Sequence, residues 1–394
     1  MPSESISLRS PSTDTARQRL LRAGAHPPAA TAVIVGVGWL GGAILRLAAF
    51  MFSHMIVIDH DTCGAATVLG GVSEVADVGR PKVDVAARWA RRRAAARVTP
   101  IALPVQMLGS GFWRHVARRS ALAWCALDNG FAVAAATRAC RLAGLPVVTA
   151  NIDRARGLVR VFPSVPEAAC FHCLGVGLTR IGKGCLDPLA SRISSPTIAA
   201  PGIAEIVATL ALHQGIAAAS SSQAAYEIRW THTDSAPLPA VTLNQLPRSR
   251  QCTQAHVAAD PPRLVQLKAP TSAVTLADVR EAATSDHKGR VTLDGGRLVT
   301  RLECARRCGA PAVEVLRLAS TLTECDLCPR CAGEMVPVRY APETWTGREA
   351  AVRGVTLADL GSPLWPVLRV RDCAGMTEVE VTGDRRKLLP GGLR

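Results

Sequence analysis

Three glycines near the N-terminus have the spacing of a phosphate-binding turn. Gly36, Gly38 and Gly41 form the pattern G-x-G-x-x-G after a β-branched run and before an apolar helical stretch. Such glycines permit a tight turn and let a phosphate approach the helix N-terminus. Asp59 ends the next apolar strand, about 20 residues on, where an acid can hydrogen-bond a ribose hydroxyl. The pattern predicts a nucleotide site; the alternative is an ordinary strand–helix–strand unit with a glycine turn.

A lysine and further acids favour ATP as that nucleotide. Asp61 follows Asp59, and Lys82 stands in a Gly-Arg-Pro-Lys turn that opens a helix. A triphosphate needs cations near its β- and γ-phosphates, whereas a dehydrogenase needs no lysine there. Asp128 ends another expected strand, at the edge of the sheet where a carboxylate can hold Mg²⁺. The chemistry expected of these side chains is therefore the handling of ATP with Mg²⁺.

The segments that carry these residues alternate between strand and helix patterns. Strands are expected at 32–37, 55–58, 101–105, 121–127, 146–150, 159–162 and 226–232, and helices at 39–51, 81–97, 112–118, 131–143 and 202–214. This alternation predicts an α/β fold with a Rossmann-like, doubly wound and mostly parallel sheet. Ligands bind such sheets at the C-terminal edge of the strands, where Gly38, Asp59 and Asp128 would meet.

In combination, these motifs resemble those of the ThiF/MoeB/E1-like adenylating enzymes. The resemblance covers about residues 15–257 and rests on motifs in the family's order: GVGWLGG, the pair Asp59/Asp61, GRPK, Leu127-Asp128-Asn129 and Cys170-Phe-His-Cys173. It implies ATP-dependent adenylation of the C-terminal glycine of a small ubiquitin-like or sulfur-carrier protein that ends in Gly-Gly. It also implies that Asn129 belongs to the nucleotide site together with the glycines, the two acids and Lys82.

The chain departs from that family at positions that bear on catalysis. Thr67 stands where the family has an asparagine, and Gly70 where it has the arginine that contacts the phosphates. Val133 and Ala134 stand where it has an Arg-Asn pair, and Arg80 is the candidate to replace the missing arginine. One alternative is therefore a catalytically degenerate, nucleotide-binding scaffold subunit. Another, which rests on the glycine pattern alone, is an NAD-binding oxidoreductase.

The resemblance also implies a dimer. In that family an N-terminal arm lends an arginine to the partner subunit's ATP, and an apolar helix like that at 202–214 forms the dimer face. Arg17 and Arg19, in a short helix expected at 14–25, are the candidates for the arm. The alternative for this segment is a surface helix with exposed arginines. A homodimer is expected.

Cys170 and Cys173 follow a strand and have the C-x-x-C spacing that brings two thiolates to one Zn²⁺ ion. In the resembled family, two more ligands come from a second C-x-x-C several dozen residues on. Here Cys252 and His256 are the candidates. Because Cys252 has no second cysteine at the expected spacing, packed thiols without a metal are the alternative.

Cys185 lies in a glycine- and lysine-rich loop that is unsuited to a core. Lys183 and Arg180 would favour its thiolate form. Its offset from Cys173 resembles that of the mobile loop of ThiF proteins that carries a reactive cysteine. The resemblance implies that Cys185 attacks the acyl-adenylate and gives a thioester or a persulfide-linked intermediate. The alternative is an incidental loop cysteine.

The C-terminal third contains a denser group of cysteines among short strand patterns, which predicts a smaller, β-rich, zinc-ribbon-like region. The expected Zn²⁺ ligands are Cys304, Cys308, Cys328 and Cys331, with Cys325 as an alternative ligand and a site without metal as the other interpretation. A hairpin with a glycine turn is expected at 291–300, and two strands at 367–382. The segment Val-Thr-Leu-Ala-Asp occurs at 274–278 and again at 355–359, and is expected to open or cap a small unit at each place.

The amino-acid composition limits the classes of protein to which this chain can belong. The chain has 394 residues, is 48% hydrophobic and 4% aromatic, and carries a formal net charge of +15. Its first 30 residues lack the apolar core of a signal peptide, and polar residues interrupt the apolar stretch near 40–58, so a cytoplasmic protein with no membrane contact is expected. Its 13 cysteines then favour metal sites or catalysis over disulfides.

The positive charge is interpreted as arginine on solvated helix faces such as 88–97, because no nucleic-acid motif accompanies it. The alternative is an acidic protein partner that the charge attracts. The expected partners are the carrier protein and a downstream conjugating partner. Four segments are expected: a disordered N-terminus at 1–13, an adenylation domain at 14–257, a linker at 258–271 and a cysteine-rich domain at 272–394.

Overall fold

The structure is a computed structural model. It describes residues 31–68, 71–94, 96–128, 130–152, 156–174, 202–220, 224–231, 240–250, 252, 263–284, 289–294, 296–321 and 327–389. These residues divide into two compact units: one contains those of 31–105 and 114–252, the other those of 106–113 and 263–389. Within the described ranges, no helix combines the length and the apolar character needed to cross a membrane.

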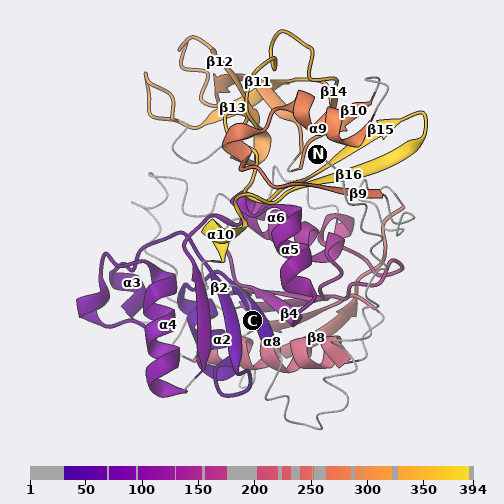
Figure 1. Cartoon of the computed structure of the whole chain (residues 1–394). Coiled ribbons are helices and arrows are strands. Elements are labelled where there is room, and N and C mark those ends of the chain that lie inside the picture. Colours follow the sequence, from indigo (N-terminus) through magenta and orange to yellow (C-terminus); the bar gives the residue numbers. More distant parts are fainter. Residues whose placement is uncertain are drawn as a thin grey trace. The chain divides into compact units, whose positions relative to one another are not determined.

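An eight-stranded sheet organises the first unit (Figure 1). The strand order is β3-β2-β1-β4-β5-β6-β7-β8, in which the first five strands run parallel and the last three continue the sheet antiparallel. The strands are β1 (Thr31–Val35), β2 (His54–Ile58), β3 (Arg97–Ile101), β4 (Ser120–Cys125), β5 (Val147–Ile152), β6 (Arg156–Phe162), β7 (Tyr226–Thr231) and β8 (Ala240–Gln245). The predicted mostly parallel α/β fold is confirmed.

Helices cover this sheet. Those that pack on its strands are α2 (Trp39–Ala48), α4 (Lys82–Arg93), α6 (Gly130–Leu142) and α8 (Ile203–Ser220). The unit also contains helix α3 (Ala65–Val68) and the 3-10 turns η1 (Val75–Asp77) and η3 (Phe171–Leu174), while α5 (Ser110–Ala117) and the turn η2 (Val105–Met107) have residues in both units. Residues of α2, α4 and α8 share one core with β1, β2 and β4. Trp124 of β4 anchors α8, because its indole N–H donates a 2.9 Å hydrogen bond to the carbonyl of Ala211.

Three predicted boundaries in this unit are wrong. The helix expected to end at residue 214 is α8, which continues to Ser220. The helix expected to reach Arg97 ends at Arg93, and the strand expected at 101–105 is instead β3, Arg97–Ile101. The backbone N–H of Arg97 donates to the carbonyl of Ser53 at 3.0 Å, which starts the pairing with β2 four residues before the predicted strand. Pro100 is tolerated within β3 because that strand is the edge of the sheet.

The second unit is β-rich, as predicted, and contains two sheets. One has the order β14-β10-β15-β16-β9 and the other the order β12-β11-β13. The strands are β9 (Arg263–Leu267), β10 (Arg290–Thr292), β11 (Leu298–Cys304), β12 (Val313–Leu318), β13 (Met335–Tyr340), β14 (Thr344–Trp345), β15 (Val367–Asp372) and β16 (Gly375–Val381). Helices α9 (Leu276–Ala283) and α10 (Arg385–Leu388) and the turns η4 (Thr271–Ala273) and η5 (Ala319–Thr321) complete it. The two strands expected at 367–382 are β15 and β16, which pair antiparallel.

The hairpin expected at 291–300 is wrong. β10 pairs with β14 and β15, whereas β11 pairs with β12 and β13, so the segment between them crosses from one sheet to the other. Asp294 explains the difference. Its carboxylate accepts hydrogen bonds from the backbone N–H and hydroxyl of Ser110, both at 2.8 Å, and from the backbone N–H of Val367 at 2.9 Å. The chain at Asp294 is therefore held by distant segments rather than by its own turn.

Candidate active site at the carboxyl edge of the parallel sheet

The parallel strands that carry the predicted site end at one level. Ile58 of β2 and Cys125 of β4 are both register partners of Val35 in β1. The backbone N–H of Gly36 donates to the carbonyl of Ile58, and that of Ala126 donates to the carbonyl of Val35, each at 2.8 Å. The glycine turn and the segments that lead to Asp59 and Asp128 therefore begin side by side.

The three glycines serve different purposes. Gly36 has a φ of +87°, and a Cβ there would lie 2.6 Å from the carbonyl oxygen of Ala126. A Cβ at Gly41 would lie 1.9 Å from the carbonyl oxygen of Gly36, so both glycines are needed for the turn to close on its own chain. Gly38 is different, because a Cβ there would meet nothing within 4 Å. It stands at the N-terminal cap of α2 and leaves open space.

The carboxylate of Asp59 is buried and joins the two loops of the site. Its Oδ2 accepts a 2.7 Å hydrogen bond from the backbone N–H of Val37 in the glycine turn. Its Oδ1 accepts a 2.9 Å bond from the backbone N–H of Asp61. Asp59 therefore fixes the glycine turn against the loop after β2, and presents its charge between them.

Backbone hydrogen bonds bring the Gly-Arg-Pro-Lys turn to the same loop. The N–H of Lys82 donates to the carbonyl of Asp61 at 2.9 Å, and that of Cys63 donates to the carbonyl of Arg80 at 2.8 Å. The N–H of Gly79 returns a 2.8 Å bond to the carbonyl of Cys63. This pairing places the first residue of α4 beside the acids that follow β2.

Lys82 is the cation at this edge. Its Nζ donates a 2.8 Å hydrogen bond to Oδ2 of Asp61. Burial alone would lower the pKa of Lys82, but the charge of Asp59, the hydrogen bond to Asp61 and the charges of Asp61 and Asp128 outweigh it and raise the pKa above its usual value. Lys82 is therefore positively charged at every physiological pH.

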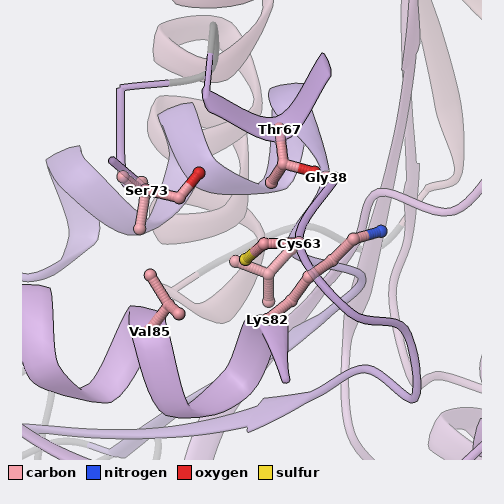
Figure 2. Close-up of a pocket in the computed structure, with 8 residues that line it drawn as sticks. Gly38, Cys63, Thr67, Ser73, Lys82 and Val85 are labelled. Carbon is pink, nitrogen blue, oxygen red and sulfur yellow. The ribbon is translucent and has the colours of Figure 1, made fainter. Parts of the chain in front are cut away.

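A pocket opens beside Gly38 (Figure 2). Lys82 and Val85 of α4 lie on one side of it, and Thr67 of α3 and Ser73, which follows α3, lie on the other. Its lining comprises Val37, Gly38, Cys63, Thr67, Val72, Ser73, Lys82 and Val85, and its empty volume of about 230 Å³ includes open solvent. No sequence motif indicates Cys63, Ser73 or Val85, because their place in the pocket depends on how the segment after β2 folds over α4.

The remaining predicted residues of the nucleotide site lie close to this edge or outside the described residues. Asp128 is exposed after β4, and its charge reaches Lys82. The exposed Arg80 sits in the turn before α4. It is the weakest contributor to the lowered pKa of Asp77, behind a backbone hydrogen bond from Glu74 and an ion pair with Arg88. The oxygen and nitrogen atoms of Asp59, His60 and Asp61 lie within 4.8 Å of one another and could share a cation.

Several predictions fall on residues that the structure does not describe. These are Arg17, Arg19, Gly70, Asn129, Cys185, His256 and Cys325. Thr67 is described: it lies in α3, and its hydroxyl accepts a 3.2 Å hydrogen bond from the backbone N–H of Gly64. Val133 and Ala134 lie in α6.

The predicted cysteine ligands come together in two groups. In the first unit, Sγ of Cys170 lies 3.7 Å from Sγ of Cys173 and 3.6 Å from Sγ of Cys252. In the second unit, Cys304, Cys308, Cys328 and Cys331 have sulfur atoms within 4.8 Å of one another. A tetrahedron with Zn–S bonds of about 2.3 Å has S···S edges of about 3.8 Å. Both groups are close enough to hold a metal ion.

Comparisons with known proteins bear on the first unit. No curated protein matches the chain. Among solved structures, Escherichia coli MccB with MccA-N7isoASN is similar over 61% of this chain and 69% of its own, at 19% identity and a TM-score of 0.45. PaaA is similar over 62% of this chain and 86% of its own, at 13% identity and a TM-score of 0.42. The model of the ThiF family matches residues 28–253. These residues make up more than half of the chain and include the site described above, and the chain therefore belongs to the ThiF family.

Proposed function

We propose that this protein is an ATP-dependent adenylyltransferase that activates the C-terminal carboxylate of a small ubiquitin-like or sulfur-carrier protein ending in Gly-Gly. Membership of the ThiF family supports an E1-like enzyme of this kind. The observation that carries the proposal is the position of Lys82, a cation that lines the pocket next to Gly38. Three carboxylates act on its charge, those of Asp59, Asp61 and Asp128.

The residues present fit ATP and Mg²⁺. Gly38 leaves open space where a side chain would stand, at the N-terminus of the ten-residue helix α2, so a phosphate can approach the backbone there. Lys82 supplies the positive charge that a triphosphate requires. Asp59, with Asn129, is the proposed contact for the ribose. The exposed carboxylate of Asp128 is the ligand type that Mg²⁺ prefers.

In the proposed reaction, a carboxylate oxygen of the carrier attacks the α-phosphorus of ATP. A bond forms between that oxygen and the phosphorus, the bond to the bridging β-oxygen breaks, and pyrophosphate leaves an acyl-adenylate behind. Lys82 neutralises charge on the phosphates, and Arg80 does so in place of the arginine that the family has at position 70. Mg²⁺ at Asp128 would add to this neutralisation. The acceleration comes mainly from positioning and from charge stabilisation.

A second step is proposed for Cys185. Its thiolate attacks the carbonyl carbon of the acyl-adenylate, the carbon–oxygen bond to AMP breaks, and a thioester remains for transfer to a conjugating partner. Lys183 and Arg180, which precede Cys185 closely in the sequence, support this proposal, because cations favour a thiolate. The Cys185→Ala variant should keep ATP–pyrophosphate exchange but lose a carrier adduct that hydroxylamine or an excess of a small thiol cleaves.

We propose that Cys170, Cys173 and Cys252 hold a structural Zn²⁺ ion, with His256 as the fourth ligand. The three sulfur atoms have the separation that one metal requires, and a histidine completes a common structural set.

We also propose that the protein acts as a homodimer in which Arg17 or Arg19 reaches the partner's nucleotide.

A catalytically degenerate scaffold subunit is the second candidate function. Glycine at position 70 favours it, since the family's phosphate-binding arginine is missing there. An NAD-binding oxidoreductase is less well supported, because it gives Lys82 no role. The three functions differ in their ligands: the scaffold binds MgATP without turnover, and the oxidoreductase binds NAD.

The test is ATP–pyrophosphate exchange with purified protein and candidate carriers that end in Gly-Gly. An adenylyltransferase should exchange only when the carrier is present, and a carrier without its terminal glycine should not support exchange. The Asp128→Ala variant should lose the activity. Tight MgATP binding without exchange would favour the scaffold function, and unchanged exchange by Asp128→Ala would contradict the role proposed for that residue.

A further inference from the structure

The three-stranded sheet β12-β11-β13 has four cysteines where a core would be. Cys304 ends β11, Cys308 follows it, and Cys328 and Cys331 precede β13. Sγ of Cys304 lies 3.5 Å from Sγ of Cys331, and Sγ of Cys308 lies 3.5 Å from Sγ of Cys328. We infer that these four thiolates form a closed, structural zinc site on which the folding of this small sheet depends. It is separate from the three-cysteine group of the ThiF region and independent of adenylation.

Two backbone turns arrange the ligands. Arg307 and Ala332 have φ values of 49° and 50°, a left-handed conformation that non-glycine residues adopt rarely. Arg307 donates its N–H to the carbonyl of Cys304 at 2.9 Å, and Ala332 donates to that of Cys328 at 2.8 Å. Each cysteine pair thus lies at a turn that contains one left-handed residue. Such strained backbone is typical of functional sites, and here it directs the sulfur atoms toward a common centre.

Backbone N–H groups already point at the sulfur atoms. Cys304 accepts from Arg306 and Cys308, Cys328 accepts from Arg330 and Cys331, and Cys331 accepts from Gly333. Such donors orient the sulfur ligands of a metal. Packed thiols that served only as apolar side chains would have no need of this set of donors.

Two arginines provide countercharge. Four thiolates and one Zn²⁺ carry a net charge of −2. Arg306, from the first turn, lies over the second turn, since a Cβ at Gly333 would be 2.9 Å from its Cδ. Arg330, from the second turn, lies over the first, since a Cβ at Gly309 would be 3.0 Å from its Nη1. The arrangement is reciprocal, and it places an arginine side chain over each of the two turns that carry the cysteines.

The end of the sheet that carries the cysteines is thinly packed. Its buried core consists of Val299, Leu302, Cys304, Cys328 and Met335. Leu298, which begins β11, and Leu318, which ends β12, are buried in the larger core of this unit, whereas Val313, Val338 and Tyr340 are exposed. A core this small does not stabilise a sheet by itself, and metal binding then supplies the folding free energy. Four thiolates leave no open coordination position, which marks a structural rather than a catalytic site.

The experiment measures metal content in the full-length protein. We expect zinc to fall by one equivalent per chain in the double variant Cys308→Ala/Cys331→Ala. It should stay unchanged in Cys373→Ala, a matched control whose exposed cysteine lies outside both groups. Proteolysis of the double variant should begin within β11–β13, while MgATP binding by the first unit persists. These readouts do not require the protein to adenylate anything.

A conservative variant separates metal binding from misfolding. Cys308→His retains a zinc ligand, so the protein should keep its full metal content. After replacement of zinc by Co²⁺, its visible absorption should shift to shorter wavelength than that of the wild type, as one sulfur ligand becomes nitrogen. Unchanged zinc in the double variant, an unshifted Co²⁺ spectrum in Cys308→His, or iron in place of zinc would each overturn the inference.

Discussion

Nζ of Lys82 donates a 2.8 Å hydrogen bond to the carboxylate of Asp61, 21 positions earlier in the chain. The side chain of Lys82 is 14% exposed and that of Asp61 is 54% exposed. The lysine is therefore held by the protein, while its partner can move into solvent. An incoming triphosphate can replace Asp61 as the partner of Lys82 without leaving a buried charge unpaired.

This relationship predicts the effect of removing the cation. Lys82→Met should weaken MgATP binding about 10- to 100-fold, because a charge-assisted hydrogen bond to phosphate is lost. The melting temperature should change little, since an exposed partner carboxylate contributes little to stability. Calorimetric titration with MgATP measures the first effect and thermal unfolding the second. Lys268→Met, at an exposed site of the other unit, is the control, and equal losses in both variants would contradict the assignment.

The glycines predict a contrast between two variants that make the same chemical change. Gly38→Ala adds a methyl group to open space, so the fold should persist while MgATP binding falls about tenfold through overlap with the phosphates. Gly41→Ala forces a methyl group onto the carbonyl of Gly36 and should destabilise the protein by about 3 kcal/mol. Melting temperature and nucleotide affinity, measured on both proteins, separate these effects. Normal ATP affinity in Gly38→Ala would show that the phosphates do not bind at this turn.

Asp59 should confer a preference for an intact ribose. The wild type should bind ATP about tenfold more tightly than 2′,3′-dideoxy-ATP, because the carboxylate accepts a hydroxyl hydrogen bond. In Asp59→Asn the preference should shrink. The variant also weakens the clamp on Val37 and Asp61, so the ratio of the two affinities is the informative quantity. A ratio that is the same in both proteins would show that the ribose lies elsewhere.

Glu227 predicts a dependence of stability on pH. It is buried in β7, and burial raises its pKa, but hydrogen bonds from Arg160 and Arg229 outweigh this and lower the pKa below the ordinary value of 4.5. The unfolded chain therefore takes up the proton first as the pH falls, and the stabilisation present at neutral pH is lost below about pH 4.5.

The matching measurement compares the wild type with Glu227→Gln. The variant should be less stable by about 2 kcal/mol at pH 7, since a buried carboxylate with two arginine partners is lost. The difference should shrink when thermal unfolding is repeated near pH 3.5. A difference that stays constant between these two pH values would contradict the lowered pKa.

Local patterns were sufficient where one short segment determines the structure. The β-branched run before Gly36 predicted β1, and the C-x-x-C pairs predicted sulfur atoms that do lie together. The repeated Val-Thr-Leu-Ala-Asp segment is a clear case. Thr275 with Asp278, and Thr356 with Asp359, form the same hydrogen-bonded cap, and Thr275 and Thr356 pair with each other in an isolated bridge.

Relationships between distant segments could not be predicted. Nothing local indicates that 106–113 belongs with the C-terminal unit, because the link is a set of hydrogen bonds from Ser110 to Asp294. The hydrogen bonds to the carboxylate of Asp294 also explain why the hairpin expected at 291–300 does not form. β8 was missed since its six residues are all exposed, with Val241 and Leu243 among them, and so give no buried alternation. The position of Lys82 beside Asp61 likewise depends on backbone hydrogen bonds between 61–63 and 79–82.

The proposed adenylation cleaves ATP between its α- and β-phosphates. The most direct measurement is ³¹P NMR of the products after incubation with Mg²⁺, ATP and a carrier that ends in Gly-Gly. An adenylyltransferase should produce pyrophosphate and AMP or an acyl-adenylate, in amounts that depend on the carrier and disappear in Asp128→Ala. The appearance of ADP and inorganic phosphate, or a nucleotide bound tightly but left intact with every carrier, would contradict it.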